Sequence, residues 1–127
     1  MSNLGADVRA LLPLKTNWFH ILLSLADCEQ HGYGIMQEVL ERTDGKLRLW
    51  PATLYGTLRR LIEEGLIQES PGTGAKTEAD ARRRCYRLSP LGRAVLSAEI
   101  ERLEELVRAA RIKRRVLKSE AKTEALS

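Results

Sequence analysis

The chain has 127 residues, enough for one domain with a modest core and too few for two ordinary domains. Hydrophobic residues make up 43% and charged residues 30%, and no apolar run approaches the roughly 20 residues that a membrane-spanning helix needs. The net charge of +4 is mildly basic, so the placement of the basic residues matters more than their total. The apolar segment 18–26 lacks the basic start and cleavage site of a signal peptide, and we expect a cytoplasmic protein without a membrane partner.

Two helices are expected at the N-terminal end. Scattered apolar residues in 1–12 predict a short helical arm, which Pro13 ends. The next helix is expected over residues 15–26, with Thr16 or Asn17 as its cap. Its buried face follows the spacing i, i+3, i+4, i+7 and consists of Trp18, Ile21, Leu22 and Leu25.

The motif HGYG at residues 31–34 indicates a tight turn, because its two glycines permit one. A helix is expected to follow, to bury Ile35, Val39 and Leu40, and to end at Asp44-Gly45. The alternation in residues 47–49 predicts a very short strand after it.

Residues 51–64 predict a third helix. Pro51 suits the first helical position, where its missing N–H would have no partner in any case, and Gly65 suits the left-handed position after the last turn. One stripe is apolar and consists of Leu54, Leu58, Leu61 and Ile62. The opposite side carries Ala52, Thr53, Gly56, Arg59, Arg60 and Glu63.

Two strands of a hairpin are expected at residues 66–69 and 84–88. Tyr86 and Leu88 share one face, because side chains alternate along a strand. The segment 71–83 between the strands is polar, contains two glycines and shows no periodicity, which predicts a long hairpin loop.

The last helix is expected to start at Ser89-Pro90, with the serine as its cap. Leu91 and Val95 form a stripe that is free to pack on the rest of the domain. A second stripe follows the alternating spacing of a coiled-coil seam and would be exposed in a monomer; it consists of Leu96, Ile100, Leu103, Val107 and Ala110. We expect residues 113–127 to form a basic, frayed tail.

Three helices followed by a hairpin are the layout of a winged helix-turn-helix, in which the third helix enters the DNA major groove and the hairpin loop reaches the flanking backbone. The expected fold class is mainly α with a small β-hairpin, namely a winged helix-turn-helix plus a long C-terminal dimerisation helix. Residues 1–88 would form the arm and DNA-binding domain, and residues 89–112 the dimerisation helix. Taken alone, the pair Arg59-Arg60 would favour a solvated face paired with Glu63 or Glu64, but the layout favours contacts with DNA.

Three motifs stand at specific distances: HGYGIMQEV (31–39), WPATLYGTLRRLIEEGLI (50–67) and RRRCYRLSPLGR (82–93). In these motifs the chain resembles the PadR family of transcriptional regulators, in the short subfamily with one C-terminal helix. The resemblance implies a dimeric DNA-binding repressor whose last helix, together with the N-terminal segment, forms the dimer interface. It implies that Thr53 and Tyr55 touch DNA and that Tyr33 lies near the start of the second helix, against the backbone or the core. Cys85 departs from the family pattern, where an aromatic residue is common.

We therefore expect a sequence-specific, homodimeric repressor that binds a pseudo-palindromic operator in double-stranded DNA through helix 51–64 and the wing 70–84. The expected DNA-binding residues are Tyr33, Thr53, Tyr55, Arg59, Arg60, Lys76, Arg82, Arg83 and Arg84. The expected dimerisation residues are Leu96, Ile100, Leu103, Val107 and Ala110. The alternative is a protein-interaction module that pairs through the C-terminal helix and has an incidental basic surface.

Enzymatic chemistry is not expected. Cys28 and Cys85 are the only cysteines and form no metal-binding motif, which favours packed or idle thiols and leaves a disulfide or redox role open. His20 and His31 have no acid or nucleophile at motif spacing, and HGYG lacks the Lys-Ser/Thr of a phosphate-binding loop. We expect no catalytic residue, no metal and no cofactor, and His31 is expected to cap a helix or lie in a turn. No effector is assigned, because the last helix has no aromatic residue after Tyr86.

Overall fold

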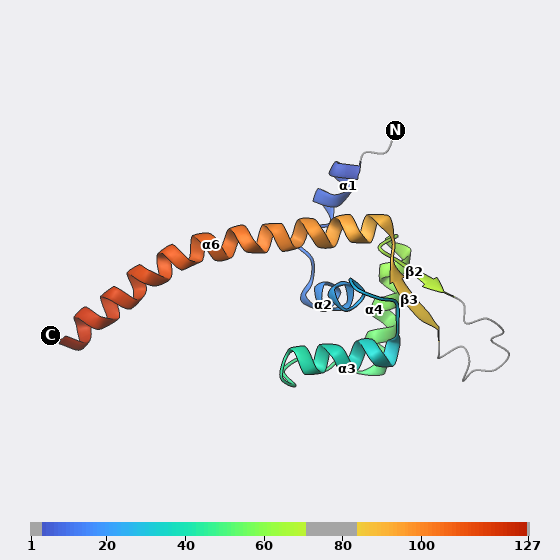
Figure 1. The fold of residues 1–127 in the computed structure, drawn as a ribbon, viewed down its shortest axis with the longest axis horizontal. Helices are drawn as coiled ribbons and strands as arrows, with labels where there is room; N and C mark the ends of the chain where they lie inside the picture. The colour runs from blue at the N-terminus through green and yellow to red at the C-terminus, as the bar shows by residue number, and fades with distance from the viewer. Residues whose placement is uncertain (1–3, 71–83, 127) are drawn as a thin grey trace.

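The computed structural model describes residues 4–70 and 84–126, whose arrangement is shown in Figure 1. The elements in chain order are α1 (Leu4–Ala10), α2 (Thr16–Ser24), β1 (Gln30–His31), α3 (Gly32–Arg42), α4 (Pro51–Glu63), β2 (Ile67–Ser70), β3 (Cys85–Leu88) and α6 (Pro90–Leu126). The structure confirms the expected class, mainly α with a small hairpin and a long C-terminal helix. None of the helices in the described ranges is long and apolar enough to cross a membrane.

The N-terminal arm forms helix α1, as the sequence predicts, and lies against α6 on the side opposite α2 (Figure 1). Helix α2 begins at Thr16, but the predicted cap is wrong. Lys15 occupies the N-cap position and makes no side-chain capping bond, because Thr16 and Asn17 already lie inside the helix. The entry to α2 is held instead by Leu14, whose N–H donates a hydrogen bond to the carboxylate of Glu99 at 2.8 Å.

The motif HGYG is not a tight turn, and this prediction is wrong. His31 ends the two-residue strand β1 and is the N-cap residue of α3, which begins at Gly32. Neither Gly32 nor Gly34 has a positive φ. A Cβ on Gly32 would lie 2.9 Å from the Tyr55 hydroxyl, so at this position the glycine permits close packing rather than a turn.

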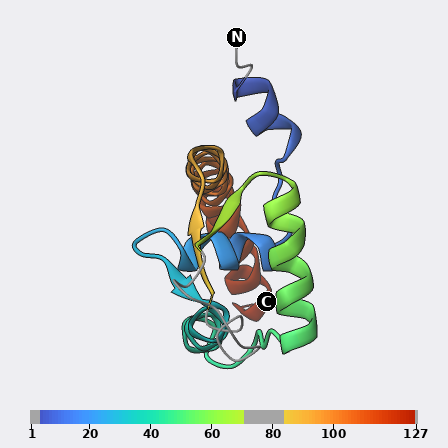
Figure 2. The ribbon, with the colours of Figure 1, turned by 90° about the vertical axis from the view of Figure 1, so that its right-hand side faces the viewer.

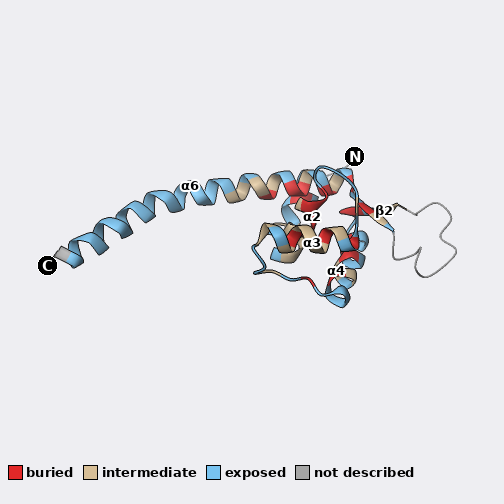
Figure 3. Cartoon of the chain, turned by 60° about the horizontal axis from the view of Figure 1, so that its bottom comes forward, coloured by how far each residue is buried: buried red, intermediate tan, exposed pale blue. Residues whose placement is uncertain are grey.

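Helices α2, α3 and α4 pack together through their apolar faces, where the buried residues in Figure 3 gather. The fully buried side chains of these helices include Ile21, Leu22, Ile35, Val39, Leu54, Leu58 and Leu61. Each such Leu or Ile contributes about 1.5–3 kcal/mol relative to an exposed position. Two predictions need correction: Leu40 is only half-buried, and Ile62 is exposed because it turns toward the edge of the leucine stripe.

The sheet has three strands in the order β1-β3-β2, all antiparallel to their neighbours. Tyr86 and Leu88 of β3 are both buried, which confirms the predicted face. Strand β1 was not predicted, because two residues are too few to show an alternation. Residues 47–49 form no strand, contrary to prediction; Leu49 is instead buried in the core. The predicted hairpin loop, residues 71–83, lies outside the described residues.

Helix α6 starts as predicted. The Ser89 hydroxyl accepts a hydrogen bond from the N–H of Gly92 at 2.9 Å and donates one to the carbonyl of Gly65, whose φ is +76°. A Cβ on Gly92 would lie 1.9 Å from the carbonyl oxygen of Leu66. The first turn of α6 is therefore fixed against the turn that leads into β2.

Helix α6 is a single helix of 37 residues that extends well beyond the body of the domain (Figure 1). We expected it to end near residue 112 and the tail to fray, but the helix continues to Leu126. Residues 113–126 contain neither Gly nor Pro and are rich in Ala, Glu, Lys and Arg, which favour helix. Figure 2 views the molecule from the hairpin end, with α6 running away behind the domain and α4 along one side.

Candidate nucleic-acid interface

Helix α4 has two different sides. Pro51 is at its first turn, and the N–H of Leu54 bonds to the carbonyl of Trp50 at 2.8 Å. Its apolar stripe is buried in the core, as predicted, through Leu54, Leu58 and Leu61. The side turned away from the core is exposed and consists of Ala52, Thr53, Gly56, Arg59, Arg60 and Glu63.

The two tyrosines among the expected DNA-binding residues, Tyr33 and Tyr55, lie near one another but in different surroundings. Tyr33, in the first turn of α3, is 66% exposed and does not enter the core. Tyr55 is half-buried and rests over Gly32, with its ring atoms and hydroxyl about 3 Å from where a Cβ would be. With Met36, Pro51 and Ala52 the two tyrosines line one shallow hollow at the junction of α3 and α4.

Arg59 and Arg60 make no ion pair with any residue that the structure describes. The pairing with Glu63 or Glu64 that we considered is therefore not formed. Two guanidinium groups without a counterion on an exposed face are available to an anionic partner.

The base of the hairpin carries Arg84, just before β3. Its guanidinium donates a hydrogen bond to the carboxylate of Glu69 on β2 at 2.8 Å, and this bond raises the pKa of Arg84 above its ordinary range. Arg84 is exposed and stays charged. The other predicted wing residues, Lys76, Arg82 and Arg83, lie outside the described residues.

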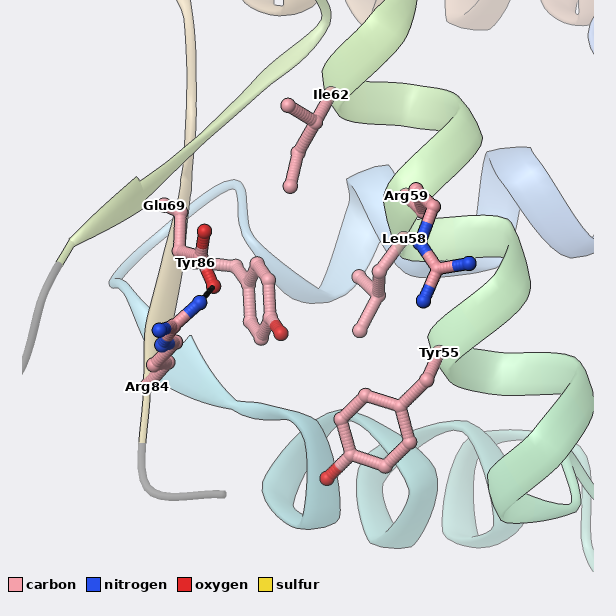
Figure 4. Close-up of a pocket in the computed structure, with 7 residues that line it drawn as sticks. All are labelled: Tyr55, Leu58, Arg59, Ile62, Glu69, Arg84 and Tyr86. Atoms are coloured by element: carbon pink, nitrogen blue, oxygen red, sulfur yellow. Dashed lines mark hydrogen bonds and ion pairs between the residues drawn. The ribbon is translucent and has the colours of Figure 1, made fainter. Parts of the chain in front are cut away.

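Between α4 and the sheet lies an open groove of about 590 Å³, drawn in Figure 4. Helix α4 supplies Tyr55, Leu58, Arg59 and Ile62, and the strands and their ends supply Glu69, Arg84 and Tyr86. The sequence predicted only that Tyr86 shares a strand face with Leu88. Strand alternation indicates which face carries a side chain, but it does not show that the end of a long ring reaches a groove.

A second groove, of about 540 Å³, separates the start of α2 from α4. Lys15, at the N-cap position of α2, and Asn17 line it on one side, and Thr53, Gly56 and Arg60 line it from α4. Nothing in the sequence pattern connects Lys15 with the third helix, because the two are distant in sequence and no motif joins them. The groove places a lysine beside the exposed side of α4.

Each histidine lies beside another side chain of the fold, and neither cysteine forms a disulfide. His20 lies 3.2 Å from a guanidinium nitrogen of Arg42, and burial together with this arginine lowers its pKa. His31 holds the N-cap position of α3 but makes no side-chain capping bond, and its Nδ1 lies 3.4 Å from the sulfur of Cys85. Cys28 and Cys85 are both free, and burial raises the pKa of the Cys85 thiol. Within residues 4–70 and 84–126 no group of three or more His, Cys, Asp or Glu could hold a metal ion.

The predicted seam of α6 divides into two parts. Leu96 is only 4% exposed and lies in the core of the single chain, so the expectation that the whole seam is exposed in a monomer is wrong for this residue. Ile100 and Leu103 are half-buried, and Val107 and Ala110 are exposed. Phe19 of α2 borders the seam, where it lines a hollow of about 360 Å³ with Ile100, Leu103 and Val107. Exposed apolar residues continue along the helix with Leu106, Ile112, Val116 and Leu117.

Known proteins are similar to this chain in sequence and in fold. The transcriptional regulator PadR-like family matches residues 21–98. A transcriptional regulator from Mycobacterium tuberculosis is 41% identical over 90 residues, which are 70% of this chain and 77% of that protein. An uncharacterized protein from Lysinibacillus sphaericus is 30% identical over 86 residues, which are 68% of this chain and 76% of that protein.

Solved structures agree with the fold. A transcriptional regulator from Clostridium thermocellum aligns with a TM-score of 0.61 at 24% identity, covering 84% of this chain and 95% of its own. The PadR protein of Bacillus subtilis, solved in complex with operator DNA, aligns with a TM-score of 0.58 at 24% identity, covering 69% of this chain and 48% of its own. The order of three helices followed by a hairpin matches the predicted winged helix-turn-helix, and the family match spans well over half of the sequence. The chain belongs to the PadR-like family of transcriptional regulators.

Proposed function

We propose that this regulator is a homodimeric repressor that binds a pseudo-palindromic operator in duplex DNA through α4 and the wing. The observation that carries the proposal is the two-sided character of α4. Its leucines anchor it in the core, while its outer side presents small residues and two arginines that have no counterion among the described residues.

The outer side of α4 suits the major groove of DNA, which admits one helix. A Cβ on Gly56 would meet no atom within 4 Å, so the helix is bare at the point of closest approach to a partner. Thr53 and Arg59 lie on either side of this glycine, and Tyr55 lies beside it. We assign sequence reading to these three side chains and a phosphate contact to Arg60.

The wing would position the protein on the DNA backbone. Arg84 is exposed at the base of the hairpin, and we assign phosphate contacts to it and to Lys76, Arg82 and Arg83. Such contacts strengthen binding to every sequence alike. That the PadR protein of Bacillus subtilis was solved with operator DNA supports duplex DNA as the partner.

A second copy of the chain would cover α6. The exposed part of the seam, where Val107 is 48% exposed, leaves apolar surface in contact with water, which is unfavourable. A two-fold symmetric dimer buries the same patch on both copies. Two copies of α4 would then read two half-sites about one helical turn, or a multiple of it, apart. A dimer seated on a promoter would exclude the transcription machinery, and this is the basis for proposing repression.

Binding of the purified chain to duplex DNA tests the proposal. The probes are DNA from immediately upstream of its own gene and a scrambled duplex of equal length, each measured over a range of salt concentrations. We expect tighter binding to the upstream DNA and a linear fall of log affinity with log salt, with a slope of about −0.9 per phosphate neutralised. Absence of salt-dependent binding to both probes would favour the protein-interaction module instead.

A further inference from the structure

Tyr86 is 6% exposed, yet its hydroxyl has no hydrogen-bond partner among the residues that the structure describes. In those residues every fully enclosed side-chain nitrogen or oxygen does have a partner. The Tyr86 hydroxyl must therefore be open to solvent, and it opens into the groove between α4 and the sheet (Figure 4). Core packing does not explain this hydroxyl, because a phenylalanine would fill the same space without a polar atom to desolvate.

The groove around this hydroxyl is arranged for an anion. Arg59 stands on the α4 wall without a counterion in the described residues, and Arg84 stands at the opposite rim. The one carboxylate in the lining, Glu69, is already bonded to Arg84. Burial, followed by the nearby charge of Glu69, raises the pKa of Tyr86, so its hydroxyl keeps its proton and can donate at neutral pH.

We infer that this groove holds one phosphate of the DNA backbone and that the Tyr86 hydroxyl donates a hydrogen bond to it. The inference rests on the proposed function. If α4 lies in a major groove and the hairpin reaches the flanking minor groove, the sugar–phosphate strand between the two grooves must cross between α4 and the sheet. The groove occupies this position, and the Tyr86 hydroxyl opens into it, while Arg59 and Arg84 make its surroundings positive.

Two substitutions with opposite expected effects test the inference. Tyr86→Phe keeps the ring in the core and removes only the donor, so affinity for duplex DNA should fall about 10-fold, as for loss of one hydrogen bond to a charged group. Because the hydroxyl is neutral, the salt slope should stay unchanged. Glu69→Gln removes the negative charge from the groove, and affinity should rise for every DNA sequence.

Leu88→Met serves as the matched control, since Leu88 lies on the same face of β3, is equally buried and does not line the groove. It should leave DNA affinity unchanged, and thermal unfolding should show that all three variants are folded. A scan of single methylphosphonate substitutions along the DNA adds a direct readout. Among the positions that weaken DNA binding by the unmodified protein, one should have no further effect on binding by Tyr86→Phe.

The outcomes separate this inference from the proposed function. If the unmodified protein binds DNA and folded Tyr86→Phe binds equally well, or loses affinity only as much as Leu88→Met, the phosphate site is wrong and the proposed function stands. If Tyr86→Phe lacks this one methylphosphonate response while Leu88→Met retains it, the site is established. If the unmodified protein binds no duplex DNA, both fail.

Discussion

The backbone N–H of Leu14 donates a hydrogen bond to the carboxylate of Glu99 at 2.8 Å, although 85 positions separate the two residues. Glu99 is 2% exposed, and both of its oxygens also bond to Arg102 one turn further along α6. A buried carboxylate is costly unless its oxygens are satisfied, and here both are. The contact fixes the entry of α2 on α6 and so joins the DNA-facing domain to the proposed dimer helix.

Glu99→Gln should destabilise the protein by about 1–3 kcal/mol at neutral pH, because the charged partner of Arg102 is lost. The hydrogen bond from Arg102, with that from Leu14, lowers the pKa of Glu99. A carboxyl with a lowered folded-state pKa stabilises the fold above its unfolded-state pKa, and this stabilisation is lost as pH falls through the folded-state pKa. Urea unfolding should therefore show a gap between the two proteins that closes in acid. A gap independent of pH would contradict this role.

Gly92→Ala should be strongly destabilising. The new Cβ would lie 1.9 Å from the carbonyl oxygen of Leu66, a backbone atom that also accepts a hydrogen bond from Ser89. Separating α6 from this turn should cost about 1–3 kcal/mol or more, measured as a lower melting temperature. Gly5→Ala in α1, where a Cβ meets nothing within 4 Å, is the control and should be neutral or stabilising by up to about 1 kcal/mol. Equal stability of the two variants would show that α6 does not pack as described.

Gly32→Ala should affect DNA binding more than stability. Its Cβ would come within 2.9 Å of the Tyr55 hydroxyl, and the end of a half-buried tyrosine can move more easily than backbone. Displacing Tyr55 on α4 should weaken DNA affinity, while thermal unfolding changes little. The DNA affinity of the double variant, Gly32→Ala combined with Tyr55→Phe, separates the effect of moving the Tyr55 ring from the effect of losing its hydroxyl. If Gly32→Ala binds DNA with unchanged affinity, Tyr55 does not contact the DNA.

Val107→Asp should break the proposed dimer without unfolding the protomer. Val107 is half exposed in the single chain, so a carboxylate there is tolerated until a partner copy buries it. Light scattering should give a dimer for the unmodified protein and a monomer for the variant, with unchanged helix content by circular dichroism. The exposed Glu101→Gln on the same helix is the control. If the unmodified protein is a monomer, the assignment of this seam as a dimer interface is wrong.

The sequence predicted the helices that have long apolar periods and clear ends. Pro51 and Gly65 bound α4 closely, and the serine cap at Ser89 forms as expected. Local patterns were less informative where distant segments meet. The sequence around Gly32 predicts a turn, whereas in the structure Gly32 packs against Tyr55. The spacing of Leu96 predicts an exposed seam residue, whereas the domain core buries it.

The candidate site was predictable to the same degree. The exposure of Arg59 and Arg60 follows from the leucine period of α4, because both residues lie off the buried stripe. The groove between α4 and the sheet does not follow, since it depends on how far β3 stands from the helix. Lys15 beside α4 likewise depends on the packing of α2, which no motif encodes.

The central claim is that α4 reads the operator, and one set of affinities tests it most directly. DNA affinity and melting temperature are compared for Arg59→Ala, Gly56→Leu and Leu58→Ala. Arg59→Ala should weaken binding to the operator by about 1–3 kcal/mol and binding to random DNA by less. Gly56→Leu should weaken binding because the leucine side chain holds the helix away from the floor of the DNA groove. Neither variant should have a lower melting temperature. Leu58→Ala should instead lose roughly 2–5 kcal/mol of fold stability through a core cavity. If Arg59→Ala and Gly56→Leu both keep full operator affinity while folded and dimeric, α4 is not the reading helix and the claim is contradicted.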